Sequence, residues 1–451
     1  MFNASIQIRE FGVVAEGVRL QRDTPDFREV DTTTFSALLR FIEEQSFRPE
    51  FEQAFTIFRK GRRRYIRVKS HVGVIETSNG CILEILPKIY NENGGLVVAQ
   101  CRRIFLRMLK TLYGSSYVVA SAAHLEAVED FPILEFFIQN YLTELELAIR
   151  GGLTNDYLIQ EDNLDFLRGR LLVNENIRHN FLSRQKFFCS FDSFSPNTAL
   201  NKILKSTLRV LTLQSRNSLT KRRLLAVSTH FENTDFTGNF RQDLIACKSN
   251  QKIVLKFAKL LEWSEIFLAG SSFGNFSGTH SNFSMLFPME KLFEKYVCFL
   301  IKRHCFGLSI KAQDRRFSLV GQMNSEGDTN FSAKLFNLRP DIVIQDNVVV
   351  LDTKWKILNE NARKYNISEA DVYQMHAYGR RYQQSRVDNI PPRLGLIYPM
   401  NPNFNHRLLQ MRFGDDMLLD VVPINLSSNS PSDEIKWIVK SFLNPSQSEK
   451  F

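Results

Sequence analysis

Short apolar runs separated by turn residues dominate the first ninety residues of the chain. In these runs apolar and polar side chains alternate, which is the period of a half-buried β-strand. We predict strands at residues 6–14, 63–69, 71–77 and 82–89. Between the first two, Thr33 to Glu44 carries apolar residues at helical spacing and predicts one helix.

From about residue 97 onward, the apolar residues recur at helical spacing. Residues 97–113 and Phe131 to Arg150 predict two long amphipathic helices, and Gly151-Gly152 ends the second. From 153 to 275 the pattern is mostly helical and is strongest at residues 200–213 and 253–270, while Gly169 between two arginines predicts a tight turn. The Gly/Ser-rich residues 270–284 are either a linker or an ordered surface loop.

The last third of the chain reads as α/β. We predict a helix from Met289 to His304, strands near 307–312 and 316–320, a hairpin, and a helix from Ser368 to Gln384 with Ser368 as its N-cap. Further strands are predicted at 393–400, 408–414 and 418–426, and a final helix at Asp433 to Phe442. The chain is therefore predicted to be an α+β multidomain protein. It has a β-rich N-terminal domain with helices (1–152), a helical middle region (153–275) and a C-terminal domain with a mixed sheet (276–451).

Composition narrows the class of protein. Hydrophobic residues make up 43% and charged residues 24% of the 451 positions, as in a globular protein. No apolar run approaches the ~20 residues that span a bilayer, and the first residues lack the pattern of a signal peptide, so we expect a cytoplasmic protein. The six cysteines form no Cys-x-x-Cys pair and are expected to be reduced core thiols.

Positive charge favours a polyanionic partner. The net charge is +10, and residues 59–69 (RKGRRRYIRVK) hold seven of the Lys and Arg residues. Part of this basic stripe is predicted to be a strand with one cationic face. The stripe could bind nucleic acid or an acidic protein surface, or it could be a solvated edge of the sheet.

The strongest chemical signal lies at residues 339–356 (RPDIVIQDNVVVLDTKWK). Asp341 leads one apolar strand, while Asp352 and Lys354 end the next and point to the same face because side chains alternate along a strand. Two carboxylates and an ammonium at the end of a buried hairpin are costly unless a metal or substrate needs them. The chemistry that fits is metal-assisted phosphodiester cleavage, and the alternative is a set of ordinary ion pairs at a solvated rim.

This pattern resembles the PD-(D/E)xK nuclease superfamily, which Pro340-Asp341 and Asp352-Thr353-Lys354 match. Residues 373–378 contain Q-x-x-x-Y, as in the helix of RecB-like members, and residues 288–297 resemble the first helix of that fold. The segments LFEKYV, RPDIVI, LDTKWK and DVYQMHAYG together resemble the McrC family. So do three segments further upstream, at residues 84–89, 167–170 and 194–201.

The resemblance implies roles for named residues. Asp341 and Asp352, with the carbonyl of Thr353, are the expected ligands of Mg²⁺, with Mn²⁺ as an alternative cation. Lys354 would orient water or stabilise charge. Glu294 would add a ligand or else form a surface ion pair with Lys291 or Lys295. Gln374 would bind the site carboxylates or water, unless its helix face is simply packed. The residues expected to contact the DNA backbone are Arg339, Tyr378, Arg380 and Arg381.

The resemblance also implies a function. McrC-type chains are the nuclease subunits of modification-dependent (type IV) restriction systems, which serve in phage defence. They act with a McrB-like AAA+ GTPase hexamer on double-stranded DNA that carries modified cytosine. The chain has no G-x-x-x-x-G-K-[ST] motif, so GTP is expected only through the partner, whose hydrolysis this chain would stimulate. A stand-alone nuclease of the same superfamily and a non-catalytic activator of an AAA+ partner are the alternatives.

Overall fold

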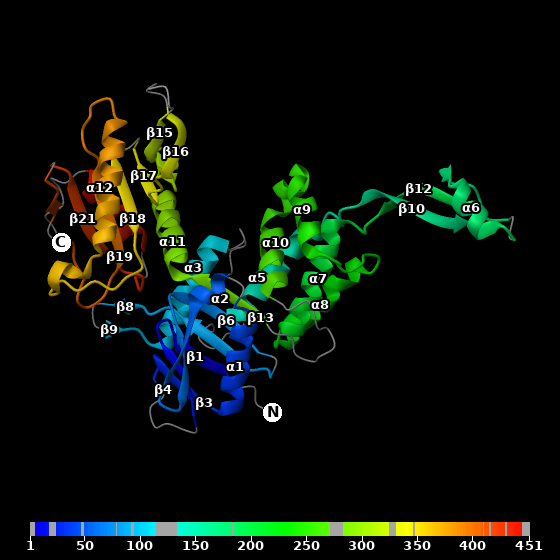
Figure 1. Cartoon of the computed structure of the whole chain (residues 1–451), viewed down its shortest axis with the longest axis horizontal. Helices are drawn as coiled ribbons and strands as arrows, with labels where there is room; N and C mark the ends of the chain where they lie inside the picture. The colour runs from blue at the N-terminus through cyan, green and yellow to red at the C-terminus, as the bar shows by residue number, and fades with distance from the viewer. Residues whose placement is uncertain are drawn as a thin grey trace. The chain divides into compact units, whose positions relative to one another are not determined.

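The computed structural model describes most of the chain (Figure 1). The described residues are 5–17, 24–46, 49–77, 79–91, 94–113, 133–182, 185–270, 283–323, 331–345, 348–408, 410–414, 416–428 and 431–443. Contacts divide the chain into two compact units. The first comprises Met1–Val74, Cys81–Asp130 and Leu286–Phe451, and the second Ile75–Gly80 and Phe131–Met285. The predicted division into three consecutive domains stays a prediction.

The N-terminal part of the first unit, mainly residues 5–113, contains two four-stranded sheets, and residues 283–288 add one strand to the first of them. One has the order β1-β7-β6-β13 and the other β3-β2-β5-β4. These strands are β1 (Ser5–Arg9), β2 (Val13–Glu16), β3 (Phe27–Val30), β4 (Phe55–Lys60), β5 (Arg63–Val68), β6 (His71–Glu76), β7 (Ile82–Leu86) and β13 (Phe283–Pro288). The remaining elements are α1 (Thr32–Glu44), α2 (Pro49–Ala54), α3 (Val98–Tyr113) and the short strands β8 (Tyr90–Asn91) and β9 (Gly94–Gly95). Three of the four strands and two of the helices predicted from the sequence are confirmed in this part. The strand predicted at 6–14 is wrong as a single strand, because the chain turns at Phe11, whose φ is +61°, and residues 6–14 contribute to β1 and β2 in different sheets.

Local sequence explains these elements. In α1 the apolar residues at helical spacing are buried, and the side chain of Asp31 caps the helix by accepting a hydrogen bond from the Thr34 backbone N–H at 2.9 Å. In β5 the side chains of Ile66 and Val68 are buried while that of Arg67 is exposed, as alternation requires. The basic stripe lies on the β4–β5 hairpin, and β4 is at the edge of its sheet.

The C-terminal part of the first unit, residues 289–443, is built on a six-stranded mixed sheet with the order β14-β17-β18-β19-β21-β20. Its strands are β14 (Ile310–Ala312), β17 (Ile342–Ile344), β18 (Val349–Thr353), β19 (Arg393–Pro399), β20 (Met411–Arg412) and β21 (Leu418–Ile424). Strands β18, β19 and β21 run parallel, and β17 pairs antiparallel with β18. A separate two-stranded sheet joins β15 (Ser318–Met323) to β16 (Phe331–Asn337).

Helices cover both faces of this sheet. They are α11 (Met289–His304), α12 (Glu369–Gln384) and α13 (Pro431–Leu443), with the 3-10 turn η2 (Arg363–Asn366) before α12. On one face the α12 residues Met375, Tyr378 and Tyr382 pack against buried residues of β18, β19 and β21. On the other, an added Cβ at Gly395 would lie 2.4 Å from the Phe442 ring, so only glycine lets α13 approach β19 this closely. The predicted helices and the hairpin are confirmed, but residues 408–414 contribute only the two-residue strand β20. Ser368 occupies the N-cap position, but its side-chain oxygen accepts no capping hydrogen bond from the backbone of α12.

The second unit corrects the prediction of a mostly helical middle region. Its helices are α5 (Ile133–Ile149), α7 (Ala199–Gln214), α8 (Ser218–Ser228), η1 (Thr229–Phe231), α9 (Phe240–Ser249) and α10 (Gln251–Gly270). Residues 156–195, however, form the three-stranded sheet β10-β12-β11 with α6. These elements are β10 (Asp156–Leu164), β11 (Arg170–Leu171), α6 (Val173–Asn180) and β12 (Phe187–Ser195). The Phe- and Ser-rich β12 pairs along its whole length with the polar β10, a long-range pairing that a search for helical periods overlooks.

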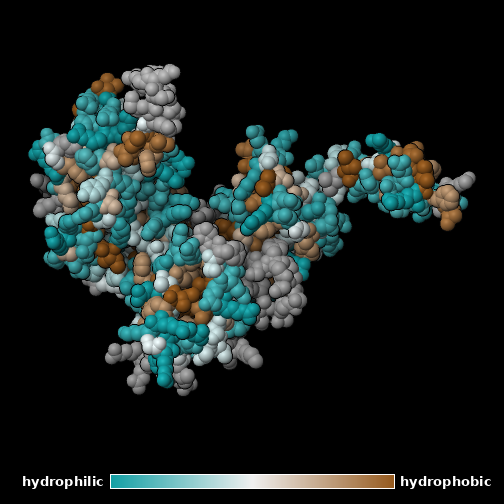
Figure 2. Space-filling model, viewed as in Figure 1, coloured by the Kyte–Doolittle hydropathy of each residue, from teal (hydrophilic) through white to brown (hydrophobic). Residues whose placement is uncertain are grey.

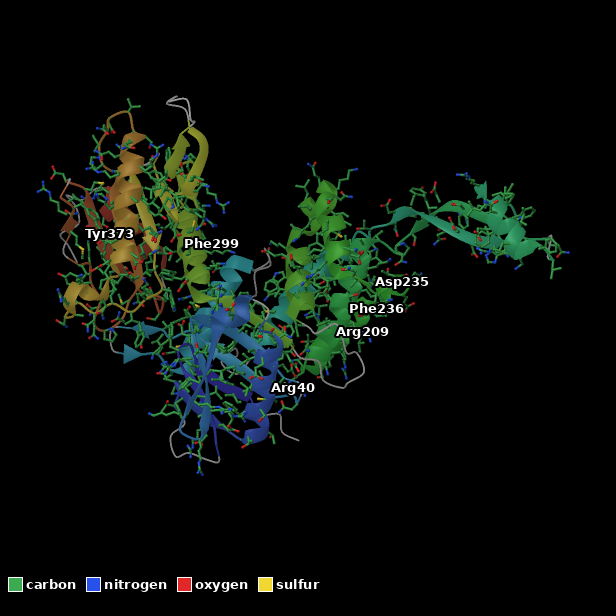
Figure 3. All side chains as sticks on the ribbon, viewed as in Figure 1. Arg40, Arg209, Asp235, Phe236, Phe299 and Tyr373 are labelled. Atoms are coloured by element: carbon green, nitrogen blue, oxygen red, sulfur yellow. The ribbon has the colours of Figure 1, made fainter. Side chains whose placement is uncertain are left out.

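This sheet and α6 form an arm that extends from the helices of the second unit (Figure 1). The predicted turn at Gly169 is confirmed by its φ of +65°, and a Cβ there would lie 2.5 Å from the Ser190 carbonyl oxygen. At the base of the arm, the exposed ring of Tyr157 lies 5.2 Å from that of Phe194. In the helices, the guanidinium of Arg209 lies 4.9 Å over the ring of Phe236 (Figure 3).

Two further sequence predictions concern segments rather than sites. Of the Gly/Ser-rich stretch at 270–284, residues 271–282 lie outside the described residues. Among the residues that the structure describes, no helix is both long and apolar enough to cross a bilayer. The predicted cytoplasmic location stays a prediction.

Candidate active site

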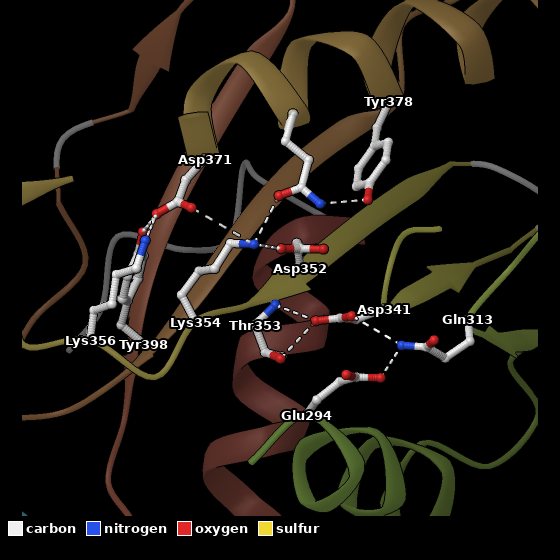
Figure 4. A network of polar contacts seen from close by, with 11 residues as sticks. Glu294, Gln313, Asp341, Asp352, Thr353, Lys354, Lys356, Asp371, Tyr378 and Tyr398 are labelled. Carbon is white, nitrogen blue, oxygen red and sulfur yellow. Dashed lines mark hydrogen bonds and ion pairs between the residues drawn. The ribbon is translucent and has the colours of Figure 1, made fainter. Parts of the chain in front are cut away.

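The hairpin of β17 and β18 brings Asp341 and Asp352 together (Figure 4). Ile342 pairs with Leu351, so Asp341, which directly precedes β17, lies beside the end of β18. The Thr353 backbone N–H and hydroxyl both donate to Oδ2 of Asp341, at 2.8 and 2.7 Å. Burial, together with repulsion from Glu294, raises the pKa of Asp341 to about 6.

Asp352 and Lys354 lie on the same side of the strand, as the alternation predicts. Asp352 is 2% exposed, and Lys354 Nζ lies 2.6 Å from its Oδ2. This close contact is an ion pair between a buried carboxylate and a largely buried ammonium. Burial and the charge of Asp341 raise the pKa of Asp352 to about 6 in spite of Lys354. Burial lowers the pKa of Lys354, but Asp352 outweighs it and the net shift is upward, which keeps the ammonium charged.

Helix α12 supplies the partners of Lys354. The Lys354 Nζ donates to Oε1 of Gln374 at 2.8 Å, and the Gln374 amide donates to the Tyr378 hydroxyl at 2.6 Å. These two residues are one helical turn apart and share the face of α12 that packs on the sheet. The structure thus brings Gln374 into the cluster, while Tyr378 is buried behind it rather than presented on the surface. Tyr373, which directly precedes Gln374, is exposed on α12 (Figure 3).

Asp371 is a member of the cluster that the sequence reasoning did not assign. Its Oδ1 lies 3.8 Å from Lys354 Nζ, and its Oδ2 lies 2.7 Å from Lys356 Nζ. The Tyr398 hydroxyl donates to the same Oδ2 at 3.3 Å. An acidic residue in the first turn of a helix is usually a surface residue that interacts favourably with the helix dipole. Only its spacing of three residues before Gln374 places it on the same face.

Gln313 is the second unassigned member. It directly follows β14 with a φ of +51°, and its side-chain amide donates to Asp341 Oδ1 at 3.3 Å and to Glu294. The expected ligand Glu294 therefore reaches Asp341 through Gln313, and no hydrogen bond joins the two carboxylates (Figure 4). Burial raises the pKa of Glu294. In the sequence, Gln313 is only a polar residue after a short predicted strand, and nothing there indicates that it belongs to the site.

Of the three expected DNA-contacting arginines, Arg339 adjoins the cluster, because its charge acts against the burial that raises the pKa of Glu294. Arg339 is exposed directly before Pro340. Arg380 is exposed and donates to Gln383 at 3.4 Å, whereas Arg381 lies 5.4 Å over the ring of Phe317. In the helical geometry of α12, Arg381 follows Gln374 by seven residues and so shares its side of the helix, and Arg380 does not.

The donor set of the cluster fits a hard divalent cation. Two neighbouring buried carboxylates whose pKa values are raised would be stabilised by a cation, and oxygen atoms are the ligands that Mg²⁺ and Mn²⁺ prefer. Within the described parts of the chain, no three His, Cys, Asp or Glu side chains are grouped closely enough to hold a metal ion. A cation held by Asp341 and Asp352 would therefore need further ligands, and the Thr353 carbonyl is the one expected from the sequence.

Comparison with known proteins bears on the family and the fold of the chain. The family model described as "McrBC 5-methylcytosine restriction system component" matches residues 66–399. No protein of curated function matches the chain.

Two solved structures are similar to the chain. One is a chain of a half-complex from a tetradecameric assembly of Thermococcus gammatolerans McrB AAA+ hexamers with bound McrC. It shares 15% identity at a TM-score of 0.64, with 97% of this chain and 100% of that chain covered. The other, from the Thermococcus gammatolerans McrBC complex, shares 16% identity at a TM-score of 0.45, with 67% of this chain and 88% of that chain covered. The first similarity shows a shared fold.

Proposed function

The chain belongs to the family of McrBC 5-methylcytosine restriction system components, and on this premise we propose that it is the DNA-cleaving subunit of such a system. The proposal is a PD-(D/E)xK endonuclease that depends on Mg²⁺ or Mn²⁺ and works with an AAA+ GTPase hexamer, whose GTP hydrolysis it stimulates. The substrate would be double-stranded DNA carrying modified cytosine. The observation that carries it is the buried cluster of Asp341, Asp352 and Lys354 at the end of the β17–β18 hairpin.

Asp341 and Asp352 would hold the cation, which, when bound, stabilises negative charge on the scissile phosphate and acidifies a bound water. Both carboxylates are pre-oriented for this task. Thr353 fixes one oxygen of Asp341 through two hydrogen bonds, and Asp352 is fixed beside Lys354. A site held in this way needs little reorganisation when the charge of the phosphate develops.

Lys354 acts as a cation and not as a base. Because its pKa is raised, it stays protonated at neutral pH, and its ammonium can donate to a phosphate oxygen or orient a water. Gln374 and Asp371 hold that ammonium from the side of α12. In this role Lys354 offsets the charge that develops on the phosphate oxygens as the bond to the leaving oxygen breaks.

The arm of the second unit supports a role in binding a protein partner. Apolar side chains are exposed along it (Figure 2), and the most exposed of them is that of Leu182, at 95%. They are Tyr157, Ile159, Phe166, Leu167, Val173, Ile177, Phe181, Leu182 and Phe194. Exposed apolar patches of this kind mark interaction sites, and the similar chain of known structure belongs to an assembly with AAA+ hexamers. The basic stripe on β4–β5 remains a candidate for DNA or for an acidic partner surface.

The test reconstitutes the chain with the AAA+ GTPase of its own host, GTP, Mg²⁺ and methylated plasmid DNA. We expect Asp352→Asn and Lys354→Ala to abolish cleavage while stimulation of GTP hydrolysis is kept. The exposed Gln251→Ala, in the second unit, serves as the control and should leave both unchanged.

The other outcomes separate the alternatives. Cleavage that survives both substitutions, together with a loss of GTPase stimulation, would refute the assigned site. Robust cutting by the isolated chain without any GTPase would identify a stand-alone nuclease. GTPase stimulation without cleavage by the parent protein would identify a non-catalytic activator.

A further inference from the structure

A polar contact joins the N-terminal part of the first unit to the residue directly after Lys354. The carboxylate of Glu10 accepts hydrogen bonds from the indole N–H of Trp355, whose Nε1 lies 2.9 Å from Oε1 and 3.0 Å from Oε2. The same Oε1 accepts from the Lys88 backbone N–H at 2.8 Å. Glu10 is fully buried, and burial raises its pKa to about 8 against the effect of these donors. A buried carboxyl group needs hydrogen-bond partners, and those of Glu10 are the Lys88 backbone N–H and the indole of Trp355, of which only Trp355 belongs to the C-terminal part.

Trp355 links Glu10 to the candidate site. Its ring lies 5.2 Å from that of Phe293, the residue before Glu294 on α11. The indole is thus held by a ring of α11 on the one hand and by the Glu10 carboxylate on the other. Because Lys354 and Trp355 share a peptide bond, fixing the indole restricts the backbone that carries the Lys354 side chain.

A pocket of about 290 Å³ opens beside this contact. Phe11, Lys88 and Tyr90 line it from the N-terminal part, and Trp355, Lys356 and Met400 from the C-terminal part. Trp355 is buried and packs on Phe293, and at the side of this pocket the hydrogen bonds of Glu10 add a polar restraint on the indole. Lys356, on the pocket wall, also forms the 2.7 Å ion pair with Asp371, which lies 3.8 Å from Lys354.

We propose that Glu10 is a positioning residue of the cleavage reaction, which holds Trp355 and thereby keeps the Lys354 ammonium against Asp352 and Gln374. The inference rests on the proposed function of Lys354. It makes the N-terminal part of the first unit a component of the nuclease centre, 345 residues away along the chain from the tryptophan it orients.

The test uses the full chain with Trp263→Phe and Trp437→Phe, so that Trp355 is its one tryptophan, together with the host GTPase, GTP, Mg²⁺ and methylated DNA. Three variants are compared in this background. Glu10→Ala removes the acceptor and Glu10→Gln keeps one. Asp31→Ala removes the cap of α1, which weakens the same part of the protein without touching Trp355.

We expect Glu10→Ala to shift the emission of Trp355 and to slow single-turnover cleavage by about tenfold to a hundredfold, as a small misplacement of a reacting group does. Stimulation of GTP hydrolysis should be unchanged. Glu10→Gln should recover most of the rate, and Asp31→Ala should retain the parent rate and emission.

Each contrary result has a distinct meaning. An emission shift without slower cleavage, or no shift at all, overturns the inference. So does an equal loss in Asp31→Ala, a failure of Glu10→Gln to recover the rate, or a parallel loss of GTPase stimulation, since these show loss of folding rather than misplacement. If the parent protein does not cleave DNA, both the proposed function and this inference are wrong. Parent cleavage with an equally active Glu10→Ala refutes the inference alone.

Discussion

Replacing Asp352 by Asn is expected to stabilise the protein while it abolishes cleavage. Burial and the charge of Asp341 raise the pKa of Asp352 from 3.8 to about 6, even with Lys354 Nζ at 2.6 Å. The folded protein therefore binds this proton more tightly than the unfolded chain does. The stability contributed by Asp352 is complete below about pH 4 and is lost as the pH rises through 6.

The size of the effect follows from the pKa. Each pKa unit corresponds to about 1.4 kcal/mol, so a rise from 3.8 to about 6 corresponds to at most about 3 kcal/mol of destabilisation when Asp352 is ionised. Asparagine has nearly the same shape and no charge. At pH 8 and without divalent cations, Asp352→Asn should raise the free energy of unfolding by about 1–3 kcal/mol. At pH 5 the gain should be about half as large, because the parent carboxyl is then mostly protonated.

Urea unfolding of the full chain at pH 5 and pH 8, with EDTA or with Mg²⁺, measures this difference. Mg²⁺ should stabilise the parent and not the variant, so the gap narrows or reverses when the cation is added. The control is Asp388→Asn, because Arg386 lowers the pKa of that exposed carboxyl to about 2 and its removal should give neither a gain nor a response to Mg²⁺. A less stable Asp352→Asn at pH 8 in EDTA would refute the reasoning, since the pair with Lys354 would then outweigh burial and repulsion.

Three further predictions concern neighbouring residues. Gln313→Ala should weaken binding of Mn²⁺ by about tenfold, because Asp341 loses the amide that orients it; calorimetric titration against Gln251→Ala measures this, and equal affinities would contradict it. Gly379→Ala should lower the free energy of unfolding by about 1–3 kcal/mol, because the new Cβ would lie 2.6 Å from Met417 Sδ and 2.9 Å from Leu394 Cδ1. An unchanged thermal midpoint would count against that packing. Glu10→Gln should flatten the pH dependence of stability: the Glu10 pKa is raised from 4.5 to about 8, so the parent loses stability as the pH rises from about 5 through 8. Parallel profiles for parent and variant would rule this out.

Local patterns were sufficient to predict the elements that carry the candidate site. The helix predicted from Met289 to His304 is α11, and the apolar runs around Asp346 form the β17–β18 hairpin. Because alternation along a strand is strict, the shared side of Asp352 and Lys354 could also be predicted. These features depend on residues that are close together in the sequence.

What escaped prediction depends on residues that are far apart. Gln313 meets Asp341 across 28 positions and Glu294 across 19, and Glu10 meets Trp355 across 345. Nothing in the residues around Gln313 or Glu10 indicates these partners. The strands β10 and β12 were missed for a related reason. Each is stabilised by its pairing with the other, and many of their apolar side chains are exposed, so neither shows the one-sided burial that reveals a strand.

The first unit is interrupted in the chain by almost all of the second, and this bears on how the protein is made. Residues 5–74 are synthesised long before residues 289–443, and most of the second unit is synthesised between them. The two parts of the first unit can therefore pack together only after most of the second unit has been made. The central parallel strand β19 is flanked by β18 and β21, and β21 follows all the other strands of this sheet in the sequence. The sheet that carries the candidate site is therefore complete only after residues 418–424 have been synthesised. A nascent chain that has not reached β21 would hold the candidate site on an incomplete sheet.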